Sequence, residues 1–275
     1  METEIVELTP SVKLYKVGET NYYLYKGEKN VLIDCGLSCT AEKLLEILEE
    51  NIDAVLITHG HFDHVGGLSV ILEQYDAEVA AHEGVAKLLG KEKVVKSWIK
   101  DDREFCKKAY EVEAVVGESE FSKKIDVALK DGDDYHGLEI IETPGHSPDT
   151  ISIYLRRENV LIASDALGYF TSSERIVPLF FYNYESYLES IKKIQMLRPY
   201  ILGLGHVYFF RGKECDKAVE NALNETLKLA ERIKAGMSDE ELIEYFIVDE
   251  LKLYPDETIK ASALLLKKRV LGSSS

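Results

Sequence analysis

The sequence lacks the cysteine pattern of a disulfide-rich or thiolate-metal protein. Its 275 residues include four cysteines, Cys35, Cys39, Cys106 and Cys215, and none of them forms a Cys-x-x-Cys pair. Neither a disulfide framework nor a cysteine zinc site is therefore indicated. We interpret the four cysteines as structural or incidental.

Positive charge and long apolar runs are also lacking. Lys and Arg number 33 against 49 Asp and Glu, which gives a net charge of −16. Non-specific attraction to nucleic acid or an anionic membrane is therefore not expected. No apolar run is long enough to span a bilayer, and the acidic start at residues 1–4 differs from a secretory signal. We expect a cytoplasmic protein with a small-molecule substrate and no membrane or nucleic-acid partner, and a homodimer is left open.

What is present is a set of short β-type runs interrupted by helical patterns. Residues 5–35 alternate in a way typical of antiparallel strands, and a helix is expected over 40–50 with Thr40 as its N-cap. A charged stretch over 91–124 is interpreted as a helical excursion over one face. The remaining strands are expected at 53–57, 78–81, 125–129, 138–142, 150–155, 159–164 and 200–204.

Two β-rich halves followed by helices define the expected architecture. Each half has strands first, then a helix, then a strand that ends in ligand-type residues, which predicts an α+β protein with four αββα layers. Beyond residue 213 the periodicity is helical, with a capping signal at Ser238. We therefore predict a β-rich domain over 1–212, a helical subdomain over 213–271 and a flexible tail over 272–275.

The strongest chemical signal is the short stretch of residues 58–64. It places four potential metal ligands directly after an apolar strand: His59, His61, Asp63 and His64. Imidazole and carboxylate suit zinc, iron or manganese. The alternative, a solvated histidine-rich turn, is disfavoured because a buried strand precedes the stretch.

Three further ligand-type residues follow strands in the second half. His146 lies in a Pro-Gly-His segment, Asp165 in a Ser-Asp segment and His206 in a Gly-His segment. Five of the seven histidines thus occur in loops that end strands, which favours one shared metal centre.

The order of these motifs over residues 10–210 resembles that of the metallo-β-lactamase superfamily. The resemblance implies that residues 1–212 form the catalytic domain. It also implies that two divalent metal ions bind; zinc is the favoured metal, and iron and manganese are alternatives. It assigns His59, His61 and His146 to the first metal. It assigns Asp63, His64 and His206 to the second, with Asp165 as the bridging carboxylate.

The same residues suggest a chemistry. Two cations about 3.5–4 Å apart can share a hydroxide whose pKa is lowered toward neutrality, and one of them polarises the substrate oxygen. Asp165 would neutralise part of the doubled charge, and the resemblance to similar enzymes implies that Asp63 accepts a proton from the bridging water. Both are therefore predicted catalytic residues.

Departures from related branches narrow the reaction. Position 61 is histidine, where the diiron oxygen-reducing flavoproteins have glutamate, and about 40 residues between Asp165 and His206 leave no room for a β-CASP insertion. The leading prediction is a glyoxalase II-like hydrolase that cleaves a thioester, ester or lactone. An iron-dependent redox enzyme, either persulfide dioxygenase-like or diiron oxygen-reducing, and a phosphodiesterase or ribonuclease of the same fold remain alternatives.

Several residues have weaker functional signals. Tyr169, Tyr208 and Arg211 are predicted substrate contacts, each with core packing or a surface role as the alternative. Asp34 would orient a ligand imidazole or simply form a turn. His82 and His136 are expected to have no ligand role. An apolar substrate channel or plain core is predicted for four aromatic residues: Phe170, Phe180, Phe181 and Tyr182.

Overall fold

The computed structural model describes residues 1–113 and 121–272, and the chain divides into two compact units, Met1–Ile141 and Glu142–Ser275. Part of the predicted 91–124 excursion and all but the first residue of the predicted 272–275 tail lie outside the described residues. Within the described ranges, no helix has both the length and the apolar character needed to cross a bilayer.

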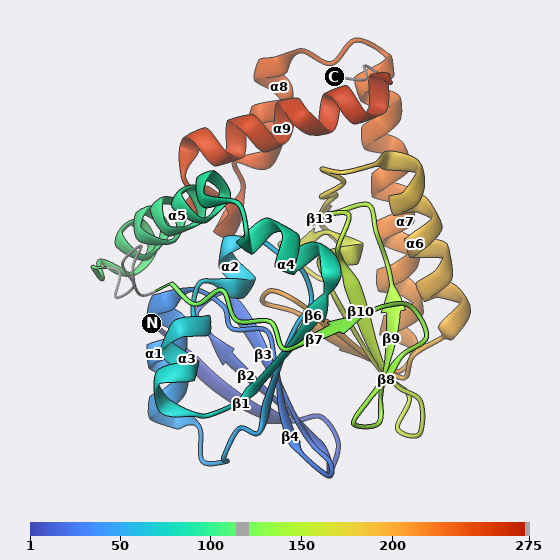
Figure 1. Ribbon diagram of the computed structural model, residues 1–275. Helices are drawn as coiled ribbons and strands as arrows, with labels where there is room; N and C mark the ends of the chain where they lie inside the picture. The colour runs from blue at the N-terminus through green and yellow to red at the C-terminus, as the bar shows by residue number, and fades with distance from the viewer. Residues whose placement is uncertain (114–120, 273–275) are drawn as a thin grey trace. The chain divides into compact units, whose positions relative to one another are not determined.

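The first unit is built on a seven-stranded sheet with the strands in chain order (Figure 1). Its strands are β1 (Thr3–Glu7), β2 (Val12–Val17), β3 (Thr20–Lys26), β4 (Asn30–Ile33), β5 (Ala54–Ile57), β6 (Glu78–His82) and β7 (Val127–Leu129). Strands β1 to β4 are antiparallel, as predicted, and β4 to β7 are parallel. The change of direction follows from the helices that connect the later strands, since parallel neighbours need a crossover connection.

The helices of the first unit form those crossovers. They are α1 (Ser38–Ile47), α2 (Phe62–Val65), α3 (Leu68–Gln74), α4 (Glu83–Leu89) and α5 (Glu92–Tyr110). The prediction that Thr40 caps α1 is wrong: Leu37 is the N-cap, and the Thr40 hydroxyl oxygen accepts a hydrogen bond from the Leu37 N–H at 3.0 Å. Thr40 therefore does take part in capping the helix, but as the third residue of α1 and not as its N-cap.

A disulfide joins α1 to α5, although the cysteine spacing indicated no disulfide framework. Cys39 and Cys106 are bonded across 67 positions of sequence, while Cys35 and Cys215 are buried free thiols. Local spacing carries no sign of this bond, because the two helices meet only when the first unit folds.

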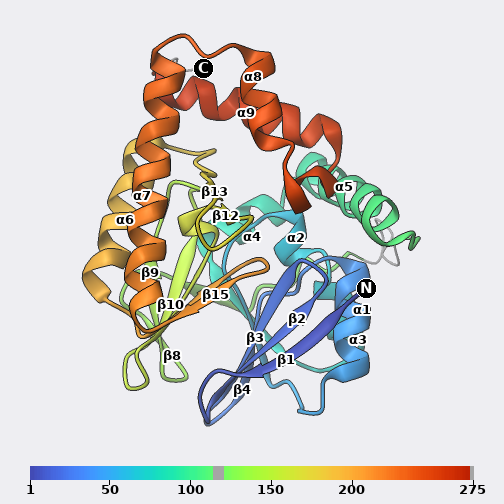
Figure 2. The same cartoon turned by 180° about the vertical axis from the view of Figure 1, so that it is seen from behind.

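The second sheet has six strands in the order β15-β14-β11-β10-β9-β8 (Figure 2). Its strands are β8 (Asp134–Tyr135), β9 (Leu138–Glu142), β10 (Ile151–Leu155), β11 (Val160–Ser164), β14 (Ile201–Leu204) and β15 (Phe209–Arg211). Strands β11 and β14 are parallel neighbours, and helix α6 (Tyr184–Leu197) lies between them in the chain. A separate pair is formed by β12 (Tyr169–Phe170) and β13 (Ile176–Val177).

Three further α-helices and two short 3-10 helices complete the second unit. They are η1 (Asp165–Leu167), α7 (Lys213–Lys234), α8 (Asp239–Phe246), η2 (Asp249–Leu253) and α9 (Asp256–Leu271). The predicted capping box at Ser238 is confirmed, since Ser238 and Glu241 exchange hydrogen bonds. The α+β class is likewise confirmed, and the predicted domain boundary at residue 212 stays a prediction.

Candidate metal centre

The histidine loop of the first unit begins at the carboxyl end of β5. Strand β4 is its parallel neighbour, so Asp34, which follows β4, and Thr58, which follows β5, leave the sheet at the same edge. The Thr58 N–H and hydroxyl each donate to one oxygen of Asp34, both at 2.8 Å. The start of the loop is thereby fixed by the preceding strand of the sheet.

Asp34 also sets the protonation of a predicted ligand. Its Oδ2 lies 2.9 Å from His64 Nδ1, and both side chains are buried. An ionised carboxylate can only accept, so Nδ1 carries the proton and Nε2 keeps its lone pair for a metal. Asp34 adopts φ 65°, and its carboxylate contacts the predicted ligand His64.

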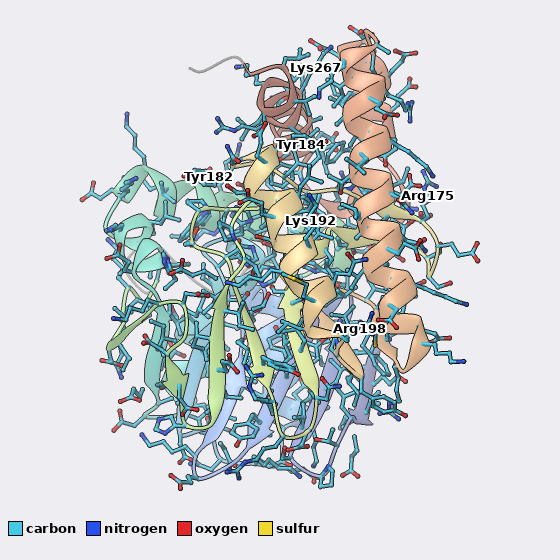
Figure 3. The ribbon with its side chains drawn as sticks, turned by 90° about the vertical axis from the view of Figure 1, so that its right-hand side faces the viewer. Arg175, Tyr182, Tyr184, Lys192, Arg198 and Lys267 are labelled. Atoms are coloured by element: carbon cyan, nitrogen blue, oxygen red, sulfur yellow. A yellow bond between two sulfur atoms is a disulfide. The ribbon has the colours of Figure 1, made fainter. Side chains whose placement is uncertain are left out.

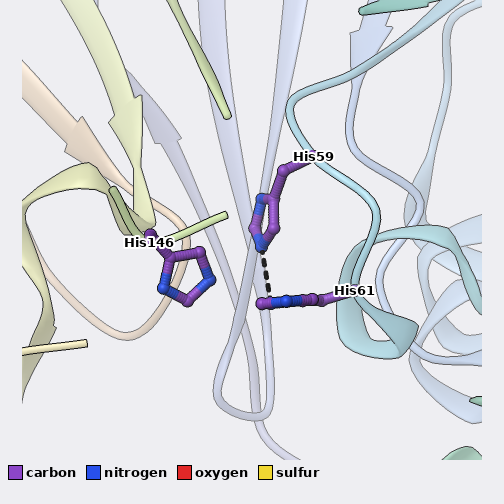
Figure 4. Close-up of side chains that lie close together, drawn as sticks. All are labelled: His59, His61 and His146. Carbon is purple, nitrogen blue, oxygen red and sulfur yellow. Dashed lines mark hydrogen bonds between the residues drawn. The ribbon is translucent and has the colours of Figure 1, made fainter. Parts of the chain in front are cut away.

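Thr58 fixes the tautomer of His59 in the same way. The Thr58 hydroxyl donates a hydrogen bond to Asp34, so its oxygen can accept a hydrogen bond from His59 Nδ1 at 3.2 Å. The lone pair of His59 is then on Nε2, which lies 3.1 Å from His61 Nδ1 (Figure 4). The rings of His59 and His64 lie 4.1 Å apart, centre to centre.

In the second unit, the two predicted ligand histidines lie on either side of the carboxylate of Asp165, the third predicted ligand. Asp165 Oδ2 lies 3.5 Å from His146 Nε2, and Asp165 Oδ1 lies 3.5 Å from His206 Nε2. His146 Nδ1 lies 2.7 Å from the carbonyl oxygen of Leu179. A carbonyl can only accept, so Nδ1 donates and the lone pair of His146 is on Nε2, facing Asp165.

The fold of the second unit explains why these side chains meet. Strands β11 and β14 run parallel, with Ser164 opposite Leu204, so Asp165 and His206 emerge at the same edge of the sheet. The His146 loop packs against α6, and a Cβ on Gly145 would lie 2.3 Å from the Tyr187 Cα. Gly145 has φ 134°, a conformation that only glycine adopts readily.

The spacing of the donor atoms fits metal coordination. Two ligand atoms bound tetrahedrally to zinc at about 2.0–2.1 Å lie about 3.3–3.4 Å apart. The three donor separations within the units, 3.1, 3.5 and 3.5 Å, are close to this value. Each oxygen of Asp165 thus faces a different imidazole, that of His146 or that of His206.

Among the described residues, His and Asp side chains form three groups that could hold a metal ion. The groups are His59, His61 and His146; His59, His64 and Asp165; and Asp63, His64 and His206. Every predicted ligand occurs in at least one group. His82 and His136 occur in none, and His82 Nδ1 instead accepts from the Gly84 N–H at the start of α4.

The three predicted substrate contacts have different surroundings. Tyr169 is buried and its ring stacks on His206 with centroids 5.1 Å apart. The Tyr208 hydroxyl lies 3.5 Å from the Thr171 carbonyl oxygen, and Tyr208 stacks on Phe210. Arg211 is exposed and pairs with Ile201, at the opposite end of β14 from His206. Their roles in substrate binding stay predictions.

Asp102 is a buried acid that the sequence did not reveal. It lies on α5 and accepts from the N–H and hydroxyl of Ser38, at the start of α1. Burial raises the pKa of the Asp102 carboxyl to about 6, against the lowering effect of the Ser38 hydrogen bonds. A Cβ on Gly66 would lie 2.8 Å from Asp102 Oδ1, so this carboxyl packs directly against the end of α2. Only its placement in an amphipathic helix could have signalled burial.

Known proteins resemble this chain over the region that contains these motifs. The profile of the family described as the metallo-beta-lactamase superfamily matches residues 15–206. A probable metallo-hydrolase of Methanocaldococcus jannaschii is 37% identical over 154 residues, which cover 54% of this chain and 67% of that protein. A hydroxyacylglutathione hydrolase of Psychromonas ingrahamii is 25% identical over 156 residues, which cover 55% of this chain and 49% of that protein.

A solved structure agrees with the fold. The crystal structure of an archaeal metallo-beta-lactamase superfamily protein from Sulfolobus tokodaii superposes with a TM-score of 0.61 at 26% identity. The match covers 76% of this chain and 81% of that one.

Proposed function

Because this chain belongs to the metallo-beta-lactamase superfamily, we propose that it is a dinuclear metal-dependent hydrolase that cleaves a thioester, ester or lactone. The observation that carries the proposal is Asp165, whose two oxygens each face a different ligand imidazole at 3.5 Å. The superfamily and the names of its relatives support hydrolysis in general, and the similarity to a hydroxyacylglutathione hydrolase favours a thioester.

The chain's donors divide naturally between two ions. His59, His61 and His146 would hold the first ion, and Asp63, His64 and His206 would hold the second. Each of these triplets is one of the groups that could hold a metal, and the remaining group joins Asp165 to one histidine of each triplet, His59 and His64. Imidazole and carboxylate donors without a thiolate suit zinc, with iron or manganese as the alternatives.

When bound, the two ions would supply a hydroxide nucleophile near neutral pH and polarise the scissile carbonyl. Asp34 holds the proton of His64 on Nδ1, and Thr58 does the same for His59. The Nε2 atom of each ring therefore keeps a lone pair that can bind a metal. The Leu179 carbonyl does the same for His146. The chain therefore keeps three imidazoles in one tautomer with partners that are themselves fixed by the fold.

The proposed reaction adds water across the acyl bond. The hydroxide oxygen bonds to the acyl carbon, the carbon–sulfur or carbon–oxygen bond breaks, and the products are a carboxylic acid and a thiol or alcohol. Asp63 is buried and would take the proton of the attacking water on a carboxylate oxygen, then return it to the leaving group. We place this activity in the cytoplasm, on a small-molecule substrate.

The test is a substrate panel with purified protein loaded with zinc, manganese or iron. We expect turnover of thioesters, esters or lactones, no turnover of phosphodiesters and two metal ions per chain by elemental analysis. His59→Ala should lower kcat/KM by more than about a hundredfold, since loss of an outer partner alone costs about 10–100-fold. The matched control is His136→Asn, which removes a histidine outside the ligand groups at a position with φ 55° that asparagine tolerates.

Two results would overturn the proposal. Full activity of His59→Ala on the best substrate would contradict a metal-assisted mechanism. Oxygen consumption with persulfides in iron-loaded protein, or cleavage of phosphodiesters alone, would replace the proposed reaction with the redox or the phosphodiesterase alternative.

A further inference from the structure

The segment that follows β13 wraps around the metal ligand His146. Leu179 accepts the His146 Nδ1 proton through its carbonyl at 2.7 Å, and the ring of Phe181 lies 5.3 Å from the His146 ring. The N–H groups of Tyr182 and Asn183 both donate to the Gly145 carbonyl, at 3.0 and 3.2 Å. The segment and the His146 loop are thus tied together on both sides of the ligand.

Helices α8 and α9 hold the same segment from its other side. Arg269 of α9 donates from Nε to the Phe181 carbonyl at 2.9 Å. Phe246 of α8 lies 6.4 Å from the Phe181 ring, and the Tyr245 hydroxyl donates to the Ile176 carbonyl at 3.3 Å. Position 181 is therefore fixed at its backbone by one helix and at its ring by another.

The two helices are themselves linked. Lys267 of α9 donates to the Met237 carbonyl at 2.7 Å and pairs with Asp239, at the start of α8, at 2.6 Å. Figure 3 labels Lys267, Tyr184 at the first position of α6 and Tyr182 just before that helix. The hydrogen bonds of Lys267 thus join α9 to the start of α8.

Phe181 differs from its aromatic neighbours in where its surface lies. Phe180 and Phe246 are at most 1% exposed and belong to the core. Tyr182 is 45% exposed, but it contacts the His146 loop through its backbone. Phe181 is half-buried, and its ring contacts both a metal ligand and the core. It therefore offers apolar surface beside the place where a substrate carbonyl would be held.

We propose that Phe181 is a specificity-determining residue that receives an apolar acyl group of the substrate, and that Arg269 is the positioning residue that sets it. This inference rests on the proposed hydrolase function and deepens it, since it names the substrate class as medium-chain or aromatic acyl compounds. An apolar ring beside His146 stabilises an acyl chain by removing its surface from water, whereas an acetyl group is too short to gain from it.

The experiment compares acetyl and octanoyl thioesters in the metal-loaded enzyme. Wild type should prefer the octanoyl substrate in kcat/KM. Phe181→Ala should lower kcat/KM for the octanoyl substrate about 10–100-fold, with less than about a threefold change for acetyl, as a hydrophobic pocket discriminates by this range. Tyr200→Ala, which removes an aromatic ring that is 57% exposed and lies just before β14, is the matched control and should preserve the preference.

The role of Arg269 is tested by one variant that removes its charge and one that keeps it. Arg269→Gln should reduce the octanoyl preference, Arg269→Lys should restore part of it, and Lys268→Gln, an exposed charge one residue away, should leave it unchanged. Metal content should stay at the wild-type level in all of them. Loss of metal in Arg269→Gln would show a merely structural role and overturn the assignment of Arg269.

Binding separates this inference from the proposed function. The affinity of octanoate relative to acetate, measured by calorimetry, should fall about 10-fold or more in Phe181→Ala even if no thioester is hydrolysed. Absence of turnover in wild type would contradict the proposed function alone. An octanoate-to-acetate affinity ratio that is the same in wild type and Phe181→Ala would overturn the inference.

Discussion

The two units supply their predicted ligands in different ways. The first unit presents four ligands within six residues, His59 to His64, whereas the second draws three from loops spread between residues 146 and 206. In the first unit one carboxylate, Asp34, orders the loop. In the second unit the ligands meet because β11 and β14 are parallel neighbours and the His146 loop packs on α6. The first unit thus carries its predicted ligands in a local motif, whereas the second unit collects its predicted ligands through the fold.

The largest expected effect is on the carboxylate that organises the second unit. Asp165→Asn keeps the shape of the side chain but removes its charge, so we expect kcat/KM to fall by more than about a hundredfold. Metal content should fall from two ions toward one, because the locally ordered loop of the first unit keeps its donors. Asp216→Asn on the exposed face of α7 is the control. Two tightly held ions in Asp165→Asn would contradict a bridging role.

The next effect concerns the residue that orders the first unit. Asp34→Asn presents an amide in place of the carboxylate that fixes His64 and Thr58, so we expect a loss of about 10–100-fold in metal affinity or activity. Competition with a chelator measures the affinity. The control is Asp53→Asn, because Asp53 bonds the Asn30 N–H at the other end of the same two strands. Equal losses in both variants would mean that Asp34 acts only through strand stability.

The third prediction concerns stability, because the Cys39–Cys106 disulfide lies in the first unit and the cysteine of the second unit, Cys215, is a free thiol. Cys106→Ser should lower the free energy of unfolding by about 2–4 kcal/mol, because the bond closes a long loop in the unfolded chain. Denaturant unfolding in oxidising buffer measures it, and activity at low temperature should persist. Cys215→Ser, which alters a free buried thiol in the second unit, should cost less. A wild-type unfolding midpoint that is insensitive to reductant would refute the bond.

The smallest expected effect is a pH dependence from Asp102. Burial raises its pKa to about 6 in the folded protein, above about 3.9 in the unfolded chain. The protonated form is therefore favoured by folding: its contribution to stability is complete below about pH 4 and is lost as the pH rises through about 6. Asp102→Asn should remove this loss, gaining about 1–3 kcal/mol relative to wild type between pH 4 and pH 7.5.

The control for this window is Glu104→Gln, an exposed acid on the same helix whose side chain is 47% exposed. Its stability difference from wild type should be the same at both pH values. A constant difference for Asp102→Asn would show that this carboxyl titrates normally.

Strong periodicity and strand-end motifs made much of the fold predictable. The antiparallel start was expected at its observed position, and the helix expected over 40–50 is observed at Ser38–Ile47. The 3-10 turns, the short β12–β13 pair and β15 were missed, since segments of two to five residues carry little periodic signal. The N-cap of α1 was misplaced because a threonine inside the first turn can bond the cap as well as form it.

The sequence by itself determined the superfamily and supplied the predicted ligands of the histidine loop, because metal chemistry restricts both residue type and spacing and a single loop keeps these residues close. Tertiary structure alone decided the Cys39–Cys106 bond, the burial of Asp102 and the place of Phe181 between His146 and Phe246. These features join residues that are far apart in sequence. Their proximity depends on which helices and strands pack together, and no local pattern records that choice.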